Sequence, residues 1–323
     1  MSLVDDPVNT TLITAMSEER KKNGVRPLWM IIQIALGIFA FIWLFKWGGI
    51  SFDQVIDRAK HISLLPLLIG ILLFSFVALL NALRYSLFFG NTINLRYLTG
   101  LYLFQNTLIT FIPWRLGELS YPILLYKDHG VPASKSLAVL LLIRLTDFSI
   151  IFFILLISGY SVSIQLEWMS IFFGIAVVAI FSLIILNKWV KKPFLQKPFQ
   201  NLKLTIKLIL NAQTITLLFV FSAILIAVMA LQTRLILEAV SLRMGYIQVL
   251  VFNAISFIAA LLPIHPPGGW GTMDSIQLFV IGNMGYDPRT SISSILVAHT
   301  IYSVIILVGG AIGWLLCKDI RKN

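Results

Sequence analysis

The chain has 323 residues and a formal net charge of +11; 58% of its residues are hydrophobic and only 12% are charged. A soluble domain carries about a quarter charged residues, so this chain lacks the side chains that would cover a soluble surface. Its mean hydropathy of +0.90 agrees with that conclusion. Composition therefore excludes a soluble enzyme or soluble binding module and predicts an integral membrane protein.

The apolar residues come in blocks long enough to cross a bilayer. A spanning helix needs ~20 mostly apolar residues, because its backbone groups must all hydrogen-bond within the helix. Blocks of this kind run over Leu28–Phe45, Ile62–Leu80, Leu137–Ile157, Trp168–Leu186, Ile215–Leu231 and Ile292–Leu316. Two further blocks, Leu98–Ile112 and Ile247–Leu262, are shorter and end at a proline.

The distribution of basic residues predicts the orientation in the membrane. Lys and Arg collect in cytoplasmic loops, and the stretch from Asn187 to Asn211 contains many lysines and no acidic residue. We expect this stretch to be cytoplasmic, together with the tail around Arg26 and the end from Lys318 onward. The loop Gly159–Glu167 has no basic residue and should lie outside. Because the basic residues flank apolar blocks, they indicate a lipid bilayer as partner and not nucleic acid.

The two short apolar blocks are predicted to form hairpins. If Leu98–Ile112 and Ile247–Leu262 each crossed the bilayer and the segments after them did not, the lysine-rich stretch would lie outside, against its charge. If each short block instead turns back at its proline and leaves the membrane on the side where it entered, every basic segment lies in the cytoplasm. We therefore predict re-entrant hairpins at about residues 95–128 and 245–285, and whether their arms span the bilayer or stop midway is open.

The two halves of the chain carry polar residues in the same order. Aligned on the hairpins, the corresponding residues are Arg84 and Arg234, Asn106 and Asn253, Glu118 and Asp274, and Arg144 and His299. Each half would contain three full spans and one hairpin, so the second half would be inserted upside down. Inverted repeats with broken helices are the architecture of secondary transporters. The predicted fold is all-α and polytopic, with two inverted repeats.

This organisation divides the chain into four parts. They are a cytoplasmic tail (1–27), a first membrane repeat (28–160), a second membrane repeat (161–317) and a cytoplasmic end (318–323). We expect a multi-pass protein of the cytoplasmic membrane with both termini in the cytoplasm. No segment is large enough for a soluble catalytic domain, so no enzymatic activity is expected, and the sequence does not determine the oligomeric state.

Both hairpin turns combine proline and glycine with polar residues. Proline removes a hydrogen-bond donor and glycine loosens the backbone, so no continuous helix can pass through either turn. Irregular backbone at membrane depth is tolerated only where protein buries it or water reaches it. The helix after each turn would direct free N–H groups inward, where they attract an anion such as phosphate, and Ser120 and Thr272 are the expected N-caps. Purely structural turns are the alternative.

Charged residues within the apolar spans are further candidates. Arg144 and Asp147 lie three residues apart on one face of a predicted helix, where a charge is costly and marks a ligand pathway or a pair. A mutually neutralising structural pair is the alternative. Arg84 and Arg234 lie near predicted span ends, where we expect them to reach the interface.

The candidates form one set of substrate-binding residues and one secondary set. The first comprises Arg115, Gly117, Glu118, Arg144, Asp147, Gly268, Gly269, Gly271 and Asp274. The secondary set comprises Asn106, Asn253, His265 and His299. The histidines have no cysteine or carboxylate at metal spacing, so we expect neither a metal nor a cofactor. Protease, hydrolase and ATPase motifs are missing from the sequence, and no catalytic residue is proposed.

Three motifs resemble the transmembrane region of the lysylphosphatidylglycerol synthase family. That family carries P-G-R-x-G-E, then E-R-x-x-D in the next span, and P-G-G-x-G-x-x-E near its end. The chain has Pro113-Trp-Arg-Leu-Gly-Glu118, Arg144-Leu-Thr-Asp147 and Pro267-Gly-Gly-Trp-Gly-Thr-Met-Asp274, in this order. It departs from the family pattern at Trp114 and Ile143, which replace a glycine and a glutamate, and at Trp270 and Asp274.

The resemblance implies a standalone lipid flippase-like membrane domain, without the soluble domain that aminoacylates lipid in bifunctional members. The leading hypothesis is a flippase or transporter of an anionic lipid, either a phospholipid or a polyprenyl-phosphate-linked lipid. One alternative is a non-transporting membrane partner of an envelope or lipid-glycan biosynthetic enzyme. The other is an intramembrane lipid-modifying enzyme.

Cysteine labelling in intact cells tests the predicted topology. In a Cys317→Ala background, which removes the only native cysteine, Ser163→Cys should react with a membrane-impermeant reagent from outside. Gln196→Cys should react only after the cells are opened, because its neighbouring lysines hold that loop in the cytoplasm. Labelling of Gln196→Cys in intact cells would contradict the inverted-repeat prediction.

Overall fold

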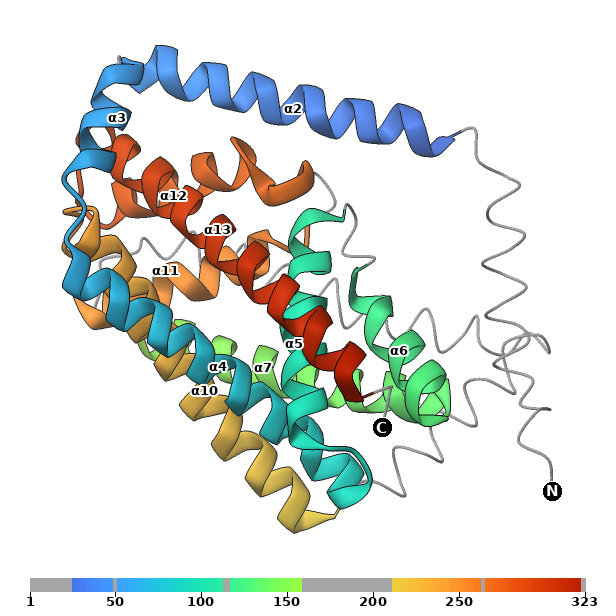
Figure 1. The fold of residues 1–323 in the computed structure, drawn as a ribbon. Helices are drawn as coiled ribbons and strands as arrows, with labels where there is room; N and C mark the ends of the chain where they lie inside the picture. Colours follow the sequence, from blue (N-terminus) through green and yellow to red (C-terminus); the bar gives the residue numbers. More distant parts are fainter. Residues whose placement is uncertain (1–24, 49–50, 113–116, 159–210, 263–264, 321–323) are drawn as a thin grey trace, which may run out of the picture.

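The structure, a computed structural model, describes residues 25–48, 51–112, 117–158, 211–262 and 265–320, and every element in these ranges is helical (Figure 1). The all-α prediction is confirmed for this part of the chain. The predicted span Trp168–Leu186 and the lysine-rich stretch after it lie outside the described residues.

Long apolar helices account for the predicted spans in the described ranges. Four of them are long and apolar enough to cross a membrane, namely α4 (Leu64–Phe89), α7 (Ala133–Ser158), α10 (Ala212–Ala239) and α13 (Pro288–Ile320). Helix α2 (Val25–Gly48) covers the first predicted block, and its apolar part, Ile31–Lys46, is shorter. The chain is therefore a multi-pass membrane protein.

Two pairs of shorter helices occupy the segments predicted to be hairpins. The first pair is α5 (Leu95–Phe111) and α6 (Ser120–His129), and the second is α11 (Tyr246–Ala259) and α12 (Thr272–Asn283). They contain 17, 10, 14 and 12 residues, fewer than the ~20 that a bilayer span requires. The helices thus break at both proline- and glycine-containing turns.

Three short elements complete the described chain. Helix α3 (Phe52–Lys60) has no buried residue and begins with a reciprocal capping box between Ser51 and Gln54. The 3₁₀ turn η1 (Gly90–Thr92) follows α4, and η3 (Pro267–Gly269) lies in the second hairpin turn. Helix α3 therefore links α2 to α4, and its half-buried Val55 packs against the core around α13.

Helix α13 joins the two halves of the molecule. It packs along α5 of the first hairpin and against α12 of the second, while α4 and α10 lie side by side (Figure 1). The α5–α13 contact is close because glycines face each other: a Cβ added to Gly313 would lie 2.5 Å from the carbonyl oxygen of Gly100. Thr107 Oγ1 also donates to the carbonyl of Ile306 at 2.7 Å. Small residues let helices in a membrane approach in this way.

Helix α2 covers the second hairpin turn. It runs across the top of Figure 1 and contacts α12 and α13. A Cβ on Gly271 would lie 2.3 Å from the carbonyl oxygen of Gly37 in the middle of α2, and Leu44, nearer the C-terminal end of α2, is fully buried. Helix α2 thus supports the turn that carries the second glycine motif.

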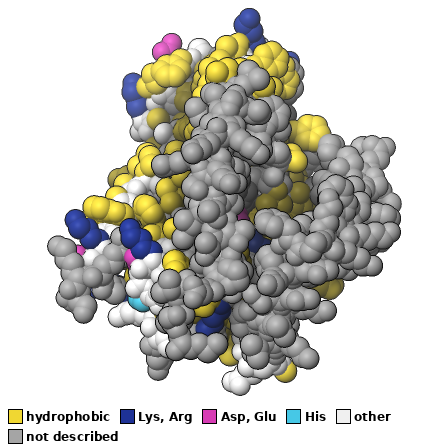
Figure 2. Space-filling model, turned by 90° about the vertical axis from the view of Figure 1, so that its right-hand side faces the viewer, with side chains coloured by type: hydrophobic (Ala, Val, Ile, Leu, Met, Phe, Trp, Pro, Cys, Tyr) yellow, Lys and Arg dark blue, Asp and Glu magenta, His cyan; other side chains and the backbone are white. Residues whose placement is uncertain are grey.

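The described helices bury two main apolar cores and expose many other large apolar side chains. One core lies among α10, α11, α12 and α13, and the other among α4, α5, α6 and α7. Large side chains such as Leu64, Leu72 and Ile157 are about 70% exposed, at 69%, 69% and 73%. Figure 2 shows apolar side chains on the surface of the described helices. Lipid tails are the environment in which such a surface is stable.

Alanine at Gly117 or Gly271 should destabilise the protein. A Cβ at Gly117 would lie 2.2 Å from the carbonyl carbon of Leu108, and Gly271 combines the contact with Gly37 with a φ of 78°. Overpacking of this kind costs typically about 1–3 kcal/mol, visible as a lower unfolding temperature of the detergent-solubilised protein. Gly245→Ala is the matched control, because its Cβ would meet only the end of the Gln248 side chain, at 3.2 Å. Equal stability of all three variants would contradict this account.

Candidate functional site

Four charged side chains form a network between the first hairpin turn and two long helices. Arg84 Nη2 of α4 donates to Asp147 Oδ1 of α7 at 2.5 Å. Arg144 Nη2, one helical turn earlier in α7, donates to Glu118 Oε1 at the start of the second hairpin arm at 3.0 Å. Arg144 Nη1 also lies 3.9 Å from Asp147 Oδ2. Two arginines and two carboxylates balance each other, which lowers the cost of placing charge inside the membrane.

The network corrects the predicted role of Arg84. We expected this side chain to reach the membrane interface, but it is only 1% exposed and pairs with Asp147. The prediction was wrong because α4 continues past Leu80 to Phe89, which places Arg84 inside the helix and against α7. Asn81, whose Oδ1 accepts from Arg84 Nη1 at 3.3 Å, supports the same geometry. Asp147 therefore has Arg84 as its nearest partner, and Arg144 has Glu118.

The Arg144–Glu118 pair is more accessible than the Arg84–Asp147 pair. Its two side chains are 25% and 22% exposed, against 1% and 9% for the other pair. The Nε of Arg144 has no hydrogen-bond partner among the described residues. The guanidinium also lies 6.0 Å from the centre of the Phe257 ring, within range of a cation–π interaction. The Nε itself is buried, so the partly exposed remainder of the guanidinium is the part of Arg144 that a ligand can reach.

A second acid–base pair lies beside the second hairpin turn. Asp274 of α12 is fully buried, and its Oδ1 lies 2.6 Å from His299 Nδ1 of α13. The other ring nitrogen of His299 lies 2.9 Å from the carbonyl oxygen of Gly268. Since both partners are acceptors, both hydrogen bonds form when both ring nitrogens carry a proton. The His299 ring also stacks on Trp270, with ring centres 4.4 Å apart.

The two acid–base pairs occupy corresponding places in the two halves. In each, the acid lies at the start of the helix that follows the turn, and the basic residue lies on the next long helix. The pairs Glu118–Arg144 and Asp274–His299 are separated by 26 and 25 residues. The alignment matched Glu118 with Asp274 and Arg144 with His299. In each half, the matched acidic residue is in contact with the matched basic residue.

The predicted N-caps of the second hairpin arms are wrong. Ser120 Oγ donates to the carbonyl of Gly117 at 2.6 Å, and Thr272 Oγ1 donates to the carbonyl of Gly269 at 3.2 Å. Both hydroxyls sit one position inside the helix and bond backward, which is a common alternative for short polar side chains. At the second arm, Asp274 Oδ2 instead accepts from the Gly271 N–H at 2.8 Å.

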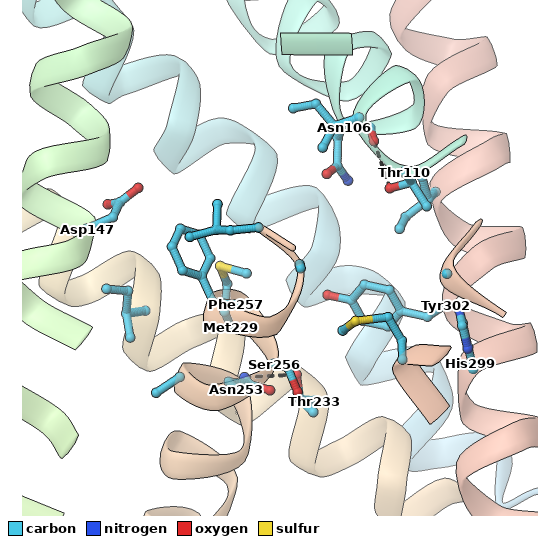
Figure 3. A pocket seen from close by; sticks show the side chains of 18 of the residues that line it. Asn106, Thr110, Asp147, Met229, Thr233, Asn253, Ser256, Phe257, His299 and Tyr302 are labelled. Carbon is cyan, nitrogen blue, oxygen red and sulfur yellow. Dashed lines mark hydrogen bonds between the residues drawn. The ribbon is translucent and has the colours of Figure 1, made fainter. Parts of the chain in front are cut away.

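A cavity of about 510 Å³ lies between the two halves. Figure 3 shows side chains from α5, α7, α10, α11 and α13 around it. Eight of the candidate residues line this cavity, namely Asn106, Arg144, Asp147, Asn253, His265, Gly268, Gly269 and His299. Many candidates from both halves, which are far apart in the sequence, thus converge on one site.

The remaining candidates lie behind the cavity wall or outside the described residues. Glu118 and Asp274 do not line the cavity but hold the two basic residues that do. Gly117 and Gly271 are packing positions in the turns. Arg115 lies outside the described residues. His265 bridges the second turn, with Nδ1 2.7 Å from Thr272 Oγ1 and Nε2 2.8 Å from the Ala259 carbonyl.

Several polar residues of the cavity were not among the candidates. Tyr85 donates to Gln105 Oε1 at 3.2 Å, and Thr233 Oγ1 accepts at 3.1 Å from the Nδ2 of Asn253, which was itself a secondary candidate. Ser256 also lines the cavity. Each of these residues lies within one helical turn of a polar residue that the sequence had singled out, namely Arg84, Asn106, Arg234 or Asn253, and this proximity is the signal that could have found them. In the described ranges, no three His, Cys, Asp or Glu side chains are placed to hold a metal ion.

These features define a polytopic helical membrane protein with a cavity that carries several polar side chains on a mainly apolar wall. A sequence model for the lysylphosphatidylglycerol synthase TM region matches residues 30–310. Because the match covers most of the chain, the protein belongs to this family of membrane-embedded regions, and the predicted resemblance is confirmed. No curated protein matches the chain at a significant level.

Breaking the Arg84–Asp147 pair should destabilise the fold. Arg84→Met leaves a buried carboxylate without its nearest partner, at a cost of about 3–5 kcal/mol. Arg84→Met combined with Asp147→Leu should recover most of this loss in a thermal unfolding experiment. The matched control is Arg96→Met, whose 3.9 Å pair with Asp319 is 61% and 65% exposed and therefore contributes little. Equal stability of Arg84→Met and Arg96→Met would show that the buried pair is not structural.

Proposed function

We propose that the protein is a flippase or transporter that moves an anionic lipid across the cytoplasmic membrane. The observation that carries this proposal is Arg144, a cation on the wall of a cavity inside a membrane protein. A charged side chain at membrane depth marks a ligand pathway unless it is fully neutralised, and the 25% exposure of Arg144 leaves it open to a ligand. The lipid is a phospholipid or a polyprenyl-phosphate-linked lipid.

In the proposed binding step, the lipid phosphate displaces Glu118 from Arg144. The planar guanidinium presents two parallel N–H donors that match two phosphate oxygens. Glu118 then moves away or takes up a proton, because it would otherwise repel the bound anion. Asp147 stays paired with Arg84, so this second ion pair keeps α7 in place while Arg144 exchanges Glu118 for the phosphate.

The cavity rim offers a route for the lipid tails. Ile112, Leu261 and Leu262 line the cavity and are 38%, 38% and 46% exposed. These side chains follow the C-terminal ends of α5 and α11, where the two hairpin turns begin. A headgroup at Arg144 would therefore leave its acyl chains beside an apolar rim, so the tails need not enter the polar site.

The proposed architecture is a pair of inverted repeats around this cavity. Support comes from the broken helices α5–α6 and α11–α12, and from the corresponding acid–base pairs beside their turns. In transporters of this build, one repeat moves against the other around a fixed site. We propose that Arg144 and His299 belong to the two moving halves, so that headgroup binding between them couples site occupancy to this motion.

Removing the Arg144–Glu118 pair should abolish transport without unfolding the protein. Arg144→Leu with Glu118→Leu removes both charges, so neither is left buried alone, and lipid movement in a liposome scrambling assay should fall to background. Arg144→Lys should be slower by about tenfold or more, since an ammonium lacks the two-donor fork. The assay uses a fluorescent anionic phospholipid.

The matched control is the double variant Arg96→Leu with Asp319→Leu. It removes an exposed ion pair of the same charge from α5 and α13, and it should move lipid at the wild-type rate. A folded Arg144→Leu, Glu118→Leu protein that still moves the lipid at that rate would remove Arg144 from the mechanism.

A further inference from the structure

The basic residues of the two acid–base pairs differ in their capacity to lose a proton. Arg144 of the first half stays charged at every physiological pH, while histidine, the type of its counterpart His299, changes charge between about pH 5 and 8. Both side chains line the cavity. Figure 3 shows His299 on the opposite side from Asp147, the neighbour of Arg144 on α7. One half of the cavity therefore carries a permanent cation, and the other carries a titratable one.

The two contacts of the His299 ring require one exchangeable proton. Nδ1 lies 2.6 Å from Asp274 Oδ1, and Nε2 lies 2.9 Å from the carbonyl oxygen of Gly268. A neutral imidazole has a single N–H donor, so a neutral ring beside a charged carboxylate can bond to only one of these oxygens. Both hydrogen bonds form once the pair has taken up a proton, whether the ring or the carboxylate carries it. The observed geometry is thus that of a proton-loaded pair.

Loss of this proton would leave a negative charge inside the protein. Asp274 is fully buried, and His299 is its only ion-pair partner among the described residues. A negative charge beside the cavity repels an anion in it, whereas the proton-loaded pair is neutral. Binding of an anion and binding of the proton therefore favour each other, and this coupling is reciprocal.

The other titratable groups around His299 make different contacts. His265 of the turn has both ring nitrogens within hydrogen-bond distance of neighbouring oxygens, and Tyr302 donates toward α10. Helix α2 has no titratable side chain near Gly37, where it meets the turn, and α3 has no buried residue. Helices α5 and α10 also contact α13, and their charged side chains form no ion pair with His299 in the described chain, namely Arg96, Arg234 and Glu238. Asp274 is thus the charged group that shares the proton.

We propose that the Asp274–His299 pair binds a proton that crosses the membrane together with the lipid. This inference rests on the proposed function and adds its energy coupling. The pair takes the proton from water on one side when the lipid phosphate binds at Arg144, and it returns the proton to water on the other side when the lipid leaves. In transporters built from inverted repeats, coupling ions bind at the interface between the repeats.

The proposal makes the movement of the lipid electroneutral, because one negative and one positive charge cross together. A pH gradient can drive such a movement, and a membrane potential cannot. The first measurement follows a fluorescent phosphatidylglycerol in liposomes that contain the full-length protein, with protein-free liposomes as the blank. An impermeant quencher reads how much of the lipid lies in the outer leaflet.

A difference of one pH unit should enrich the fluorescent lipid in the leaflet on the alkaline side, by up to about tenfold for one proton per lipid. A potassium-diffusion potential at equal pH should give no enrichment. Enrichment by the potential and not by the pH gradient would overturn the inference, because the lipid would then cross as an uncompensated anion.

Variants assign the effect to His299. His299→Arg carries a permanent cation like that of the first half, and His299→Gln cannot take up a proton, so neither variant should enrich the lipid in response to a pH gradient. His61→Gln is the matched control. His61 also lies beside an aspartate, Asp57, at 3.5 Å, but these side chains are 73% and 74% exposed, and the variant should respond as the wild type does. A wild-type response in both His299 variants would contradict the proposal.

Lipid binding at two pH values tests the same proton without transport. Wild-type protein in detergent should bind phosphatidylglycerol at least about tenfold more tightly at about pH 5.5 than at about pH 8, because the proton-loaded pair forms at low pH and is lost as the pH rises. The change should be less than about threefold in both His299 variants and as in the wild type in His61→Gln.

Glu118 is the rival site for the proton, since a protonated Glu118 would release Arg144 and strengthen phosphate binding in the same direction. Glu118→Gln separates the two. The proposal expects this variant to keep a pH-dependent affinity. An affinity that stays pH-dependent in His299→Arg and becomes independent of pH in Glu118→Gln would place the proton on Glu118 and overturn the inference.

Failure of the proposed function would look different from failure of the coupling. If the lipid neither binds to the wild type nor changes leaflet, the proposed function fails, and the coupling fails with it. If the lipid binds and moves, but a pH gradient does not enrich it and its affinity is equal at both pH values, transport stands and the proton-binding role of His299 is wrong.

Discussion

Charge neutralisation inside an apolar helix bundle is the constraint on which the rest of this structure depends. A single charged side chain at membrane depth costs several kcal/mol, yet α4 and α7 carry Arg84, Arg144 and Asp147 within helices long enough to span a bilayer. The structure satisfies this constraint by adding Glu118 from the hairpin turn. The turn must therefore lie against α7, and this requirement fixes where the first hairpin folds back.

The hairpins meet that requirement through close backbone contact. Gly117 lies so near to the backbone at Leu108 that the second arm begins directly against the first. Gly271 makes the equivalent approach to Gly37, and the N–H of Gly271 is held by Asp274, which also bonds to His299. In each turn, the closely packed glycine lies within three residues of the carboxylate that pairs with the basic residue of the next long helix.

Some of this could be predicted from the sequence, because the relevant signals are local. Apolar block length identified the four helices long enough to span a membrane, and the prolines after Ile112 and Leu262 marked the helix breaks. The order of polar residues matched Glu118 and Arg144 of the first half with Asp274 and His299 of the second. In the structure, Glu118 contacts Arg144 and Asp274 contacts His299.

Other features depend on contacts between helices that are distant in the sequence. Arg84 is buried because α4 continues to Phe89 and brings this side chain against Asp147 of α7. Hydropathy alone places the end of this span too early, at Leu80. The backward hydrogen bonds of Ser120 and Thr272 depend on the local start of each arm, to within one residue. The uncharged polar side chains of the cavity come from three helices, α5, α10 and α11, so no single stretch of sequence displays them together.

The contact between Arg144 and a lipid phosphate is the central claim, and a nitrogen–phosphorus distance tests it most directly. Protein labelled with ¹⁵N at arginine side chains is reconstituted into phosphatidylglycerol bilayers, and dipolar coupling to ³¹P is measured by solid-state magnetic resonance. The account predicts a guanidinium signal within about 4 Å of phosphorus, which disappears in the Arg144→Lys variant. An identical set of nitrogen–phosphorus couplings in the wild type and in Arg144→Lys would contradict it.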